Sequence, residues 1–305
     1  MKSLFTLLFF LTISTGLMAQ VTTTDSLFNS MSNDKQHGPV TIFESPRLIL
    51  TQSTEVLKKK NMSLVFVHRF GDVAGDLGGG RTAFGLDAIA DVYIGFEYGL
   101  TNDLNVDLGR STLPNGGGLI SGELKYALLR QTADDRSPLA ISLLGQAGVR
   151  PYNAYNTFGD RMSYFAQALF ARKFSHSFSF QIAPSILYDN QPEPNVPGNE
   201  NAIFSVSATA KLKVTKLMSI VVDYAHPFST FRNNNAGYSD ALGAGIQVVT
   251  GGHVFTLNVT NARAVSEMNY LANSGSDFLR GQYRLGFTIT RTFDFNHKEK
   301  YNPKR

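Results

Sequence analysis

Apolar and polar residues alternate one by one along much of the chain between residues 61 and 295. The alternation is clearest in five segments, whose apolar positions are Val92, Ile94, Phe96, Tyr98 and Leu100; Gly122, Leu124, Tyr126 and Leu128; Phe178, Phe180, Ile182, Pro184, Ile186 and Tyr188; Phe204, Val206, Ala208, Ala210, Leu212 and Val214; and Tyr283, Leu285, Phe287 and Ile289. Successive side chains of a β-strand point to opposite faces of its sheet. Each segment is therefore predicted to be a strand with one apolar and one polar face.

Seven further segments show a weaker form of the same pattern, over residues 62–70, 104–111, 138–149, 163–173, 217–224, 240–249 and 253–259. Together with the five clear segments they make about twelve strands. Most are close to the roughly 9 to 11 residues that a tilted strand needs to cross a membrane.

The connections between these segments alternate between short and long. The shorter ones cover residues 101–103, 131–137, 174–176, 215–216 and 250–252, and the long ones cover residues 71–90, 112–119, 151–162, 190–201, 226–239 and 260–281. Short turns at one end and long loops at the other are typical of outer-membrane barrels, whose long loops face outside the cell.

The first residues have the pattern of a secretory signal. Lys2 precedes an apolar run that ends near Ala19 and is shorter than the roughly 20 residues of a membrane-spanning helix. We therefore expect a signal peptide over residues 1–19, a periplasmic lead over 20–60, a barrel over 61–295 and a polar tail over 296–305.

The apolar stretch 48–57 needs a separate interpretation, because bacterial single-chain barrels have even numbers of strands. Counted as a wall strand, it would make the total odd. We interpret it as a periplasmic or lumen-plugging segment, and an added inner strand stays open as the alternative.

No stretch of about 18 consecutive apolar residues occurs after residue 20, which excludes transmembrane helices and leaves a closed barrel as the structure that could cross a membrane. A soluble β-sandwich also alternates, but its turns are short at both ends. Five tyrosines stand at the ends of apolar faces, where interface aromatics occur: Tyr98, Tyr126, Tyr188, Tyr224 and Tyr283. We therefore predict an all-β protein, a closed antiparallel transmembrane β-barrel in the outer membrane of a Gram-negative bacterium.

Several short motifs resemble a known family. They are Gln52-Ser53-Thr54-Glu55, Leu57-Lys58-Lys59, His68-Arg69-Phe70-Gly71 and Gly99-Leu100-Thr101-Asn102-Asp103-Leu104. In these motifs the chain is similar to the DUF5777 family of β-barrel proteins of unknown function, over most of residues 45–295. The resemblance implies a barrel and supplies no catalytic residues.

Charged residues of both signs fall on the polar faces, and we expect them to line the lumen: Arg69, Glu97, Asp107, Glu123, Lys125, Lys211, Lys213, Asp223 and Arg284. Unpaired charges are costly to bury, so the mixture predicts ion pairs that brace the wall. A role in ion selectivity is the alternative. Glycines on the same faces, Gly95, Gly99, Gly109, Gly243, Gly245 and Gly286, suit a crowded lumen.

Groups that could carry chemistry are present but scattered. The chain has no cysteine and its six histidines are far apart, so we expect no metal site and no cofactor. The glycine-rich segment 71–81 lacks the ending of a phosphate loop and the closing Glu of a calcium loop, so we interpret it as a surface loop. His68 falls on an apolar face, which indicates an interfacial residue rather than a catalytic base.

A lipid-modifying enzyme would need a nucleophile, a histidine and an orienting polar group together. The available sets are His176 with Ser177 and Ser179, His226 with Asp223, and His253 with Asn258. Their spacing in the sequence selects none of them.

The net charge of +4 is small and scattered, which gives no support for nucleic-acid binding. We expect a non-enzymatic barrel, either a narrow passive channel or a scaffold for an envelope protein partner, surrounded by outer-membrane lipid. An outer-membrane lipid hydrolase or acyltransferase is the first alternative. Adhesion through the long loops 226–239 and 260–281 is the second.

Overall fold

The computed structural model describes residues 38–112, 118–151, 157–192 and 196–295. The chain forms two units, Met1–Gly38 and Pro39–Arg305, and of the first only Gly38 is described. The predicted signal peptide and the C-terminal tail lie outside the described residues.

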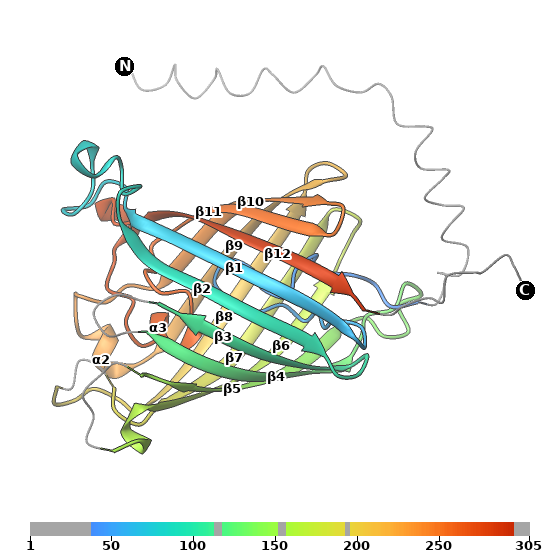
Figure 1. The fold of residues 1–305 in the computed structure, drawn as a ribbon, viewed down its shortest axis with the longest axis horizontal. Coiled ribbons are helices and arrows are strands. Elements are labelled where there is room, and N and C mark those ends of the chain that lie inside the picture. Colours follow the sequence, from blue (N-terminus) through green and yellow to red (C-terminus); the bar gives the residue numbers. More distant parts are fainter. Residues whose placement is uncertain (1–37, 113–117, 152–156, 193–195, 296–305) are drawn as a thin grey trace, which may run out of the picture. The chain divides into compact units, whose positions relative to one another are not determined.

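The second unit is a barrel of antiparallel strands (Figure 1). In chain order the strands are β1 (Asn61–Asp72), β2 (Ile89–Gly99), β3 (Leu104–Ser111), β4 (Leu119–Leu129), β5 (Ala140–Val149), β6 (Met162–Lys173), β7 (Phe178–Asp189), β8 (Ala202–Lys213), β9 (Met218–Phe228), β10 (Ala241–Thr250), β11 (His253–Thr260) and β12 (Arg284–Asp294). Each strand pairs with the next, and β1 pairs with β12 from Asn61 opposite Asp294 to Asp72 opposite Arg284. The prediction of a closed antiparallel barrel of about 12 strands is confirmed.

The two faces of the wall follow the alternation in the sequence. On β7 the exposed side chains include Phe178, Phe180 and Ile182, whereas Ser179 and Gln181 between them are buried inside the barrel. An apolar outer surface avoids the cost of contact between polar groups and lipid, and closure leaves no strand edge unpaired. No helix among the described residues is long and apolar enough to cross a membrane.

In the described part of the chain, five short helices lie outside the wall strands: η1 (Gly80–Thr82), η2 (Gly159–Arg161), α2 (Thr230–Asn233), α3 (Glu267–Tyr270) and η3 (Phe278–Arg280). All five belong to the long connections, which gather at one end of the barrel, here called the loop end. The short connections gather at the other, the turn end. The glycine-rich segment 71–81 belongs to the connection between β1 and β2 at the loop end.

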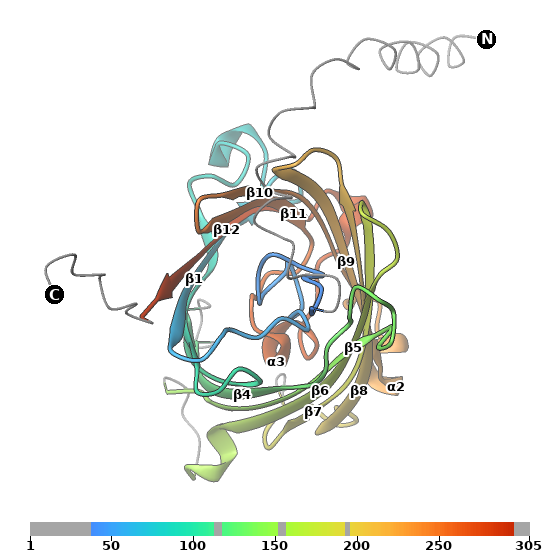
Figure 2. The ribbon, with the colours of Figure 1, turned by 90° about the vertical axis from the view of Figure 1, so that its right-hand side faces the viewer.

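Two segments fill the barrel interior (Figure 2). The first, residues 39–57, is here called the N-terminal insert. It enters at the turn end, where the Val40 N–H donates to the Gln131 carbonyl, and turns back at a tip where the Leu48 N–H donates to the Thr51 carbonyl over 2.9 Å. The second, residues 261–276, is here called the loop insert. It belongs to the connection between β11 and β12, carries α3, and is buried from Ala264 to Ala272.

The buried loop insert differs from the expectation that the whole connection 260–281 is a surface loop suited to adhesion, whereas residues 275–281 are half-buried or exposed. Val265, Met268, Tyr270 and Leu271 of this connection are almost fully buried. The sequence pattern shows that the connection is long, but it does not show on which side of the wall its apolar residues find contacts.

Two glycines let an aromatic ring lie flat against the inner wall. A Cβ added at Gly95 would come within 2.6 Å of the Tyr93 hydroxyl, and one added at Gly109 would come within 2.6 Å of ring carbon Cζ. The ring is held there, because its hydroxyl donates to Asp107 over 3.1 Å and the Arg47 guanidinium lies 4.9 Å from its centroid.

We expect Gly109→Ala to destabilise the barrel by about 1–3 kcal/mol, since the added methyl group overlaps a ring that is fixed on both sides. Urea unfolding in detergent measures the change, and tyrosine fluorescence reports it because the chain has no tryptophan. Gly122→Ala is the matched control on the outer wall, where an added Cβ meets nothing within 4 Å. An equal loss of stability in both variants would contradict the role of Gly109 in making room for the Tyr93 ring.

Candidate functional site

The two inserts are joined by a buried ion pair. Arg47 of the N-terminal insert donates through Nη2 to Glu267 Oε2 of the loop insert over 2.9 Å, and to the Val265 carbonyl over 3.0 Å. Both charged side chains are at most 4% exposed. Removal of either partner would leave a buried charge without compensation, so each insert depends on the other.

The tip of the N-terminal insert is held by charges of the barrel wall. The Asp223 carboxylate accepts hydrogen bonds from the Ile49 and Leu50 N–H groups, each over 2.8 Å. From β1, Arg69 donates to the Ile49 carbonyl over 2.9 Å and to the Ala262 and Ala264 carbonyls of the loop insert. These two predicted lumen charges therefore fix the backbone of both inserts.

A second group of predicted lumen charges lies on β2, β3 and β4. Lys125 Nζ lies 3.3 Å from Glu97 Oε1 and 3.4 Å from the Pro46 carbonyl. Glu123 accepts from Gln52 of the N-terminal insert over 3.2 Å, and from Gln146. The wall and the insert thus share one hydrogen-bond network.

Of the other four predicted lumen residues, Asp107 belongs to this second group, and three are spread more widely. Lys211 pairs with Glu44 of the N-terminal insert at 2.7 Å, and Arg284 pairs with Asp72 at 2.6 Å near the loop end. Asp107 lies opposite Glu97 and Glu123 in the strand register and accepts from Tyr93. Lys213 is half-buried at the turn-end limit of β8. The structure therefore does not bring all nine residues into one site; most of them lie along the surface of the inserts.

An apolar cluster occupies part of the interior towards the loop end. Ile49 and Leu50 at the tip of the N-terminal insert belong to one cluster with Leu144, Phe165 and Met268. Among the described residues, the cavity beside Arg47, Tyr93 and Glu123 has a volume of about 10 Å³. That is roughly the space of one water molecule. The inserts therefore occupy the interior with an apolar cluster and a polar network.

Glu55 holds the returning arm of the N-terminal insert. Its Oε1 atom accepts hydrogen bonds from the Ile42 and Phe43 N–H groups, over 2.8 and 3.2 Å. Burial raises the pKa of the Glu55 carboxyl above its usual range, and the two N–H donors offset part of the rise. The folded state therefore binds this proton more tightly than the unfolded state.

The three predicted catalytic sets are not assembled in the described part of the chain. Asp223 points into the barrel, whereas His226, three residues later on β9, lies on the outer side. Ser179 donates to the Ile42 carbonyl inside the barrel, whereas His176 is exposed in the turn before β7. His253 contacts Arg291 at the turn end, whereas Asn258 is buried nearer the loop end. Residues close in sequence are separated here because neighbouring strand positions face opposite sides.

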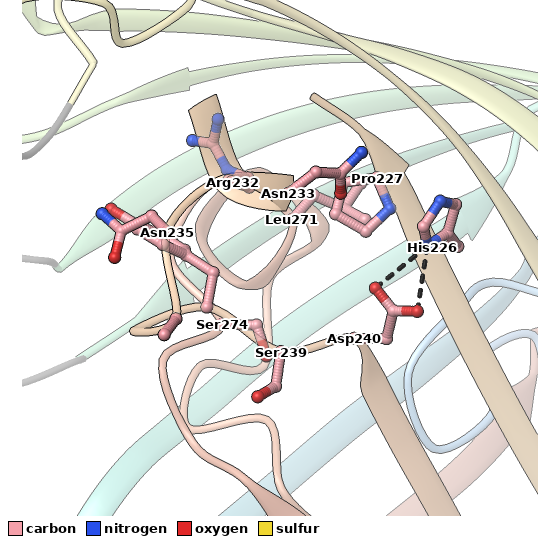
Figure 3. A pocket seen from close by; sticks show the side chains of 11 residues that line it. His226, Pro227, Arg232, Asn233, Asn235, Ser239, Asp240, Leu271 and Ser274 are labelled. Carbon is pink, nitrogen blue, oxygen red and sulfur yellow. Dashed lines mark hydrogen bonds and ion pairs between the residues drawn. The ribbon is translucent and has the colours of Figure 1, made fainter. Parts of the chain in front are cut away.

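His226 instead pairs with a residue that sequence spacing did not suggest. Its Nδ1 atom lies 2.9 Å from Asp240 Oδ2, and Tyr224 donates to the same carboxylate. Figure 3 shows the pair at the side of a loop-end cavity that contains Ser239 and Ser274. Among the described residues no hydroxyl is hydrogen-bonded to the His226 imidazole, and no cluster of His, Asp and Glu is arranged to hold a metal ion.

The predicted interface tyrosines lie near the two ends of the barrel. Tyr98 and Tyr126 are exposed towards the turn end, and Tyr188 and Tyr224 are exposed towards the loop end. Tyr283 precedes β12, where it is half-buried and stacks on Phe278 with ring centroids 5.1 Å apart. His68 is on the outer face, stacked on Phe287.

Several buried charges were not predicted from the sequence, although for one of them, Asp91, the sequence holds a signal. Asp91 has the same strand parity as Tyr93 and Glu97, is fully buried, and accepts from Ser111 and from the Val265 N–H. Extension of the β2 pattern by one residue would have found it. No strand pattern covers Arg47 or Glu267, since both lie in segments without regular alternation.

We expect Arg47→Met to destabilise the folded barrel by about 3–5 kcal/mol, because it leaves the Glu267 carboxylate buried without a partner. The double variant Arg47→Met with Glu267→Gln should lose less stability than Arg47→Met alone, since no unpaired charge remains. Urea unfolding measures all variants. Arg136→Met is the control, because the Arg136 side chain, which pairs with Asp134, is 82% exposed. This substitution should change the free energy of unfolding little. A double variant less stable than Arg47→Met alone would contradict the ion-pair role.

Glu55→Gln should stabilise the barrel by an amount that increases with pH. The amide still accepts both N–H bonds, and it avoids the cost of an ionised, buried carboxyl. Because the folded state holds the proton more tightly, the Glu55 contribution to the free energy of unfolding falls as pH rises between the ordinary and the raised pKa. The stability difference between variant and wild type, measured across this range, isolates the effect from other titrating groups. A difference that is flat or falls with pH would count against this assignment.

Comparison with known proteins identifies the family. The chain matches the membrane-bound β-barrel domain DUF5777 over residues 43–293. Among solved structures, KdgM porin superposes with a TM-score of 0.47 at 7% identity, over 77% of this chain and 99% of that chain. The COG4313 outer membrane channel from Pseudomonas putida F1 has a TM-score of 0.43 at 11% identity, with coverage of 78% and 97%. LpxR from Salmonella typhimurium superposes with a TM-score of 0.38 at 11% identity, over 76% of this chain and 100% of that chain. No curated protein matches the sequence. The match over most of the chain, together with the closed barrel, shows that this protein belongs to the DUF5777 family of membrane-bound β-barrels.

Proposed function

We propose that the protein is a non-catalytic outer-membrane barrel that is closed at rest and acts as a scaffold for an envelope protein partner. The observation that carries this proposal is that both inserts are buried against the inner wall, and the cavity beside Arg47 has a volume of only about 10 Å³. A water-filled pore would need a continuous polar path, which an apolar cluster around Ile49 interrupts.

The proposed orientation places the turn end in the periplasm and the loop end at the cell surface. It is supported by the alternation of short and long connections. In this proposal residues 1–19 direct export and are cleaved, residues 20–38 precede the N-terminal insert on the periplasmic side, and lipid surrounds the outer wall.

The filled interior also gives the scaffold a fixed loop end. Arg232 of α2 donates to the Ala272 carbonyl of the loop insert through Nε and Nη2, over 2.9 and 2.7 Å. The Ser239 N–H donates to the Ser274 carbonyl over 2.8 Å. The connection between β9 and β10 is therefore anchored to a segment that is itself held inside the barrel, which suits a surface that a partner protein recognises.

A gated channel is the second candidate, and one observation favours it. The N-terminal insert contributes no strand to the wall, since its β-bridges in the described part of the chain are the isolated ones of Pro39 with Thr132 and Arg47 with Gln52. The barrel therefore closes without this insert, and its departure would not break a wall strand pairing.

Planar-bilayer recording of the mature protein tests the proposal. We expect no sustained conductance from the wild type, and discrete steps from a variant that lacks residues 39–57, because the deletion removes the tip of the apolar cluster and the partners of Lys125 and Lys211. Flotation with liposomes confirms insertion of both proteins. Sustained steps of equal size in the wild type and the deletion variant would overturn the closed state. Brief wild-type openings with the step size of the deletion variant would support the gated channel instead.

A further inference from the structure

A cavity of about 280 Å³ lies at the loop end, apart from the lumen (Figure 3). The connection between β9 and β10 forms one side of it, and the end of the loop insert forms another. His226, Arg232, Asn233, Ser239, Asp240 and Ser274 are among its lining residues. Its volume is near the lower limit of typical small-molecule sites, which suits a ligand of about one ring.

Ser274 supplies an independent sign that this cavity takes a ligand. It lines the cavity, is 5% exposed, and its hydroxyl has no hydrogen-bond partner among the described residues. A buried hydroxyl without a partner costs about 1–3 kcal/mol, so such groups normally have a bound molecule or water beside them. Nothing else in the described structure accounts for this hydroxyl.

The charged groups of the cavity are already occupied by the protein. Arg232 donates to the Ala272 carbonyl and to the Ser229 hydroxyl, and lies 3.8 Å from the Glu200 carboxylate. Asp240 is held by His226 and Tyr224. An anionic or cationic ligand would therefore have to compete with these partners for its counter-charge.

The groups that are left are neutral. The Ser239 and Ser274 hydroxyls and the Asn233 amide each offer a donor and an acceptor, which match the hydroxyl groups of a sugar. Pro227 and Leu271 add apolar surface to the lining, suited to the C–H face of a sugar ring. This combination of a few polar groups on an apolar wall is typical of a specific small-molecule site.

We propose that the loop-end cavity binds one neutral sugar unit, with the Ser274 hydroxyl as its buried hydrogen-bond partner. The sugar is either free or the headgroup of a glycolipid, since both offer the same hydroxyl groups. One wall of the site belongs to the loop insert, so a bound sugar contacts the segment that also carries Glu267. The binding site itself does not depend on whether the barrel conducts.

Binding is tested with the full mature protein in a zwitterionic detergent, because glycoside detergents would compete for the site. The probes are methyl glucoside, methyl galactoside and N-acetylglucosamine, with glucuronate and glucose 6-phosphate as charged counterparts. Saturation-transfer NMR measures the affinity, and the rise in unfolding temperature with excess sugar gives a second readout. We expect at least one neutral sugar to bind more tightly than the charged ones.

Ser274→Ala and Asn233→Ala should each weaken this binding about tenfold, because each removes a hydrogen bond in the site. Ser207→Ala is the matched control, since Ser207 is also buried and partnerless but lies on the inner wall of β8. Asn233 is exposed, so its variant carries the test if Ser274→Ala does not fold. Absence of neutral-sugar binding by the wild type, affinity unchanged in both site variants, or preference for a charged sugar would each overturn the proposal.

The source of the sugar is settled by a second arm of the experiment. Nanodiscs with and without a glucosyl-diacylglycerol present the headgroup at the membrane surface, and free methyl glucoside is titrated into both. Loss of free-sugar binding only in the glycolipid nanodiscs, seen for the wild type and for the Ser207→Ala control alike, identifies the headgroup as the ligand. Equal binding in both preparations identifies a free sugar.

Discussion

The structure depends on the pairing of charges inside a closed wall. A membrane barrel must turn its apolar side chains outward, and the alternation of strand positions then turns every intervening side chain inward. In this protein those inward residues include Arg69, Lys125 and Asp223, each almost fully buried. Buried charges need partners, and here the backbone and side chains of the two inserts provide many of them.

This pairing explains why the inserts have so little regular structure of their own. The tip of the N-terminal insert gives its N–H groups to Asp223 and its Ile49 carbonyl to Arg69. Its backbone is thus satisfied by the wall rather than by a neighbouring strand. The loop insert is held in the same way, through its carbonyls at Ala262 and Ala264. Irregular backbone at membrane depth is tolerated because it is surrounded by protein.

The Arg47–Glu267 pair ties the two inserts together, although the two residues are far apart in the chain. The loop insert also extends to the loop end, which we propose to lie at the cell surface. There Arg232 donates to its Ala272 carbonyl. A chain of direct contacts therefore runs from the N-terminal insert to the loop-end cavity. The candidate catalytic groups do not form such a connected set, since His226 faces outward and Asp223 faces inward.

The sequence by itself determined the wall. Period-two alternation placed the strands, and β3 was predicted with its observed limits, Leu104–Ser111. Strand parity also placed most of the inward charges, because on a strand the side-chain direction follows from position alone. Tertiary structure decided what fills the barrel: residues 39–57 and 261–276 lack a periodic pattern, and their place is set by contacts with wall residues distant in sequence. The His226–Asp240 pair and the unpartnered Ser274 hydroxyl likewise arise where two connections meet in space, which no local spacing encodes.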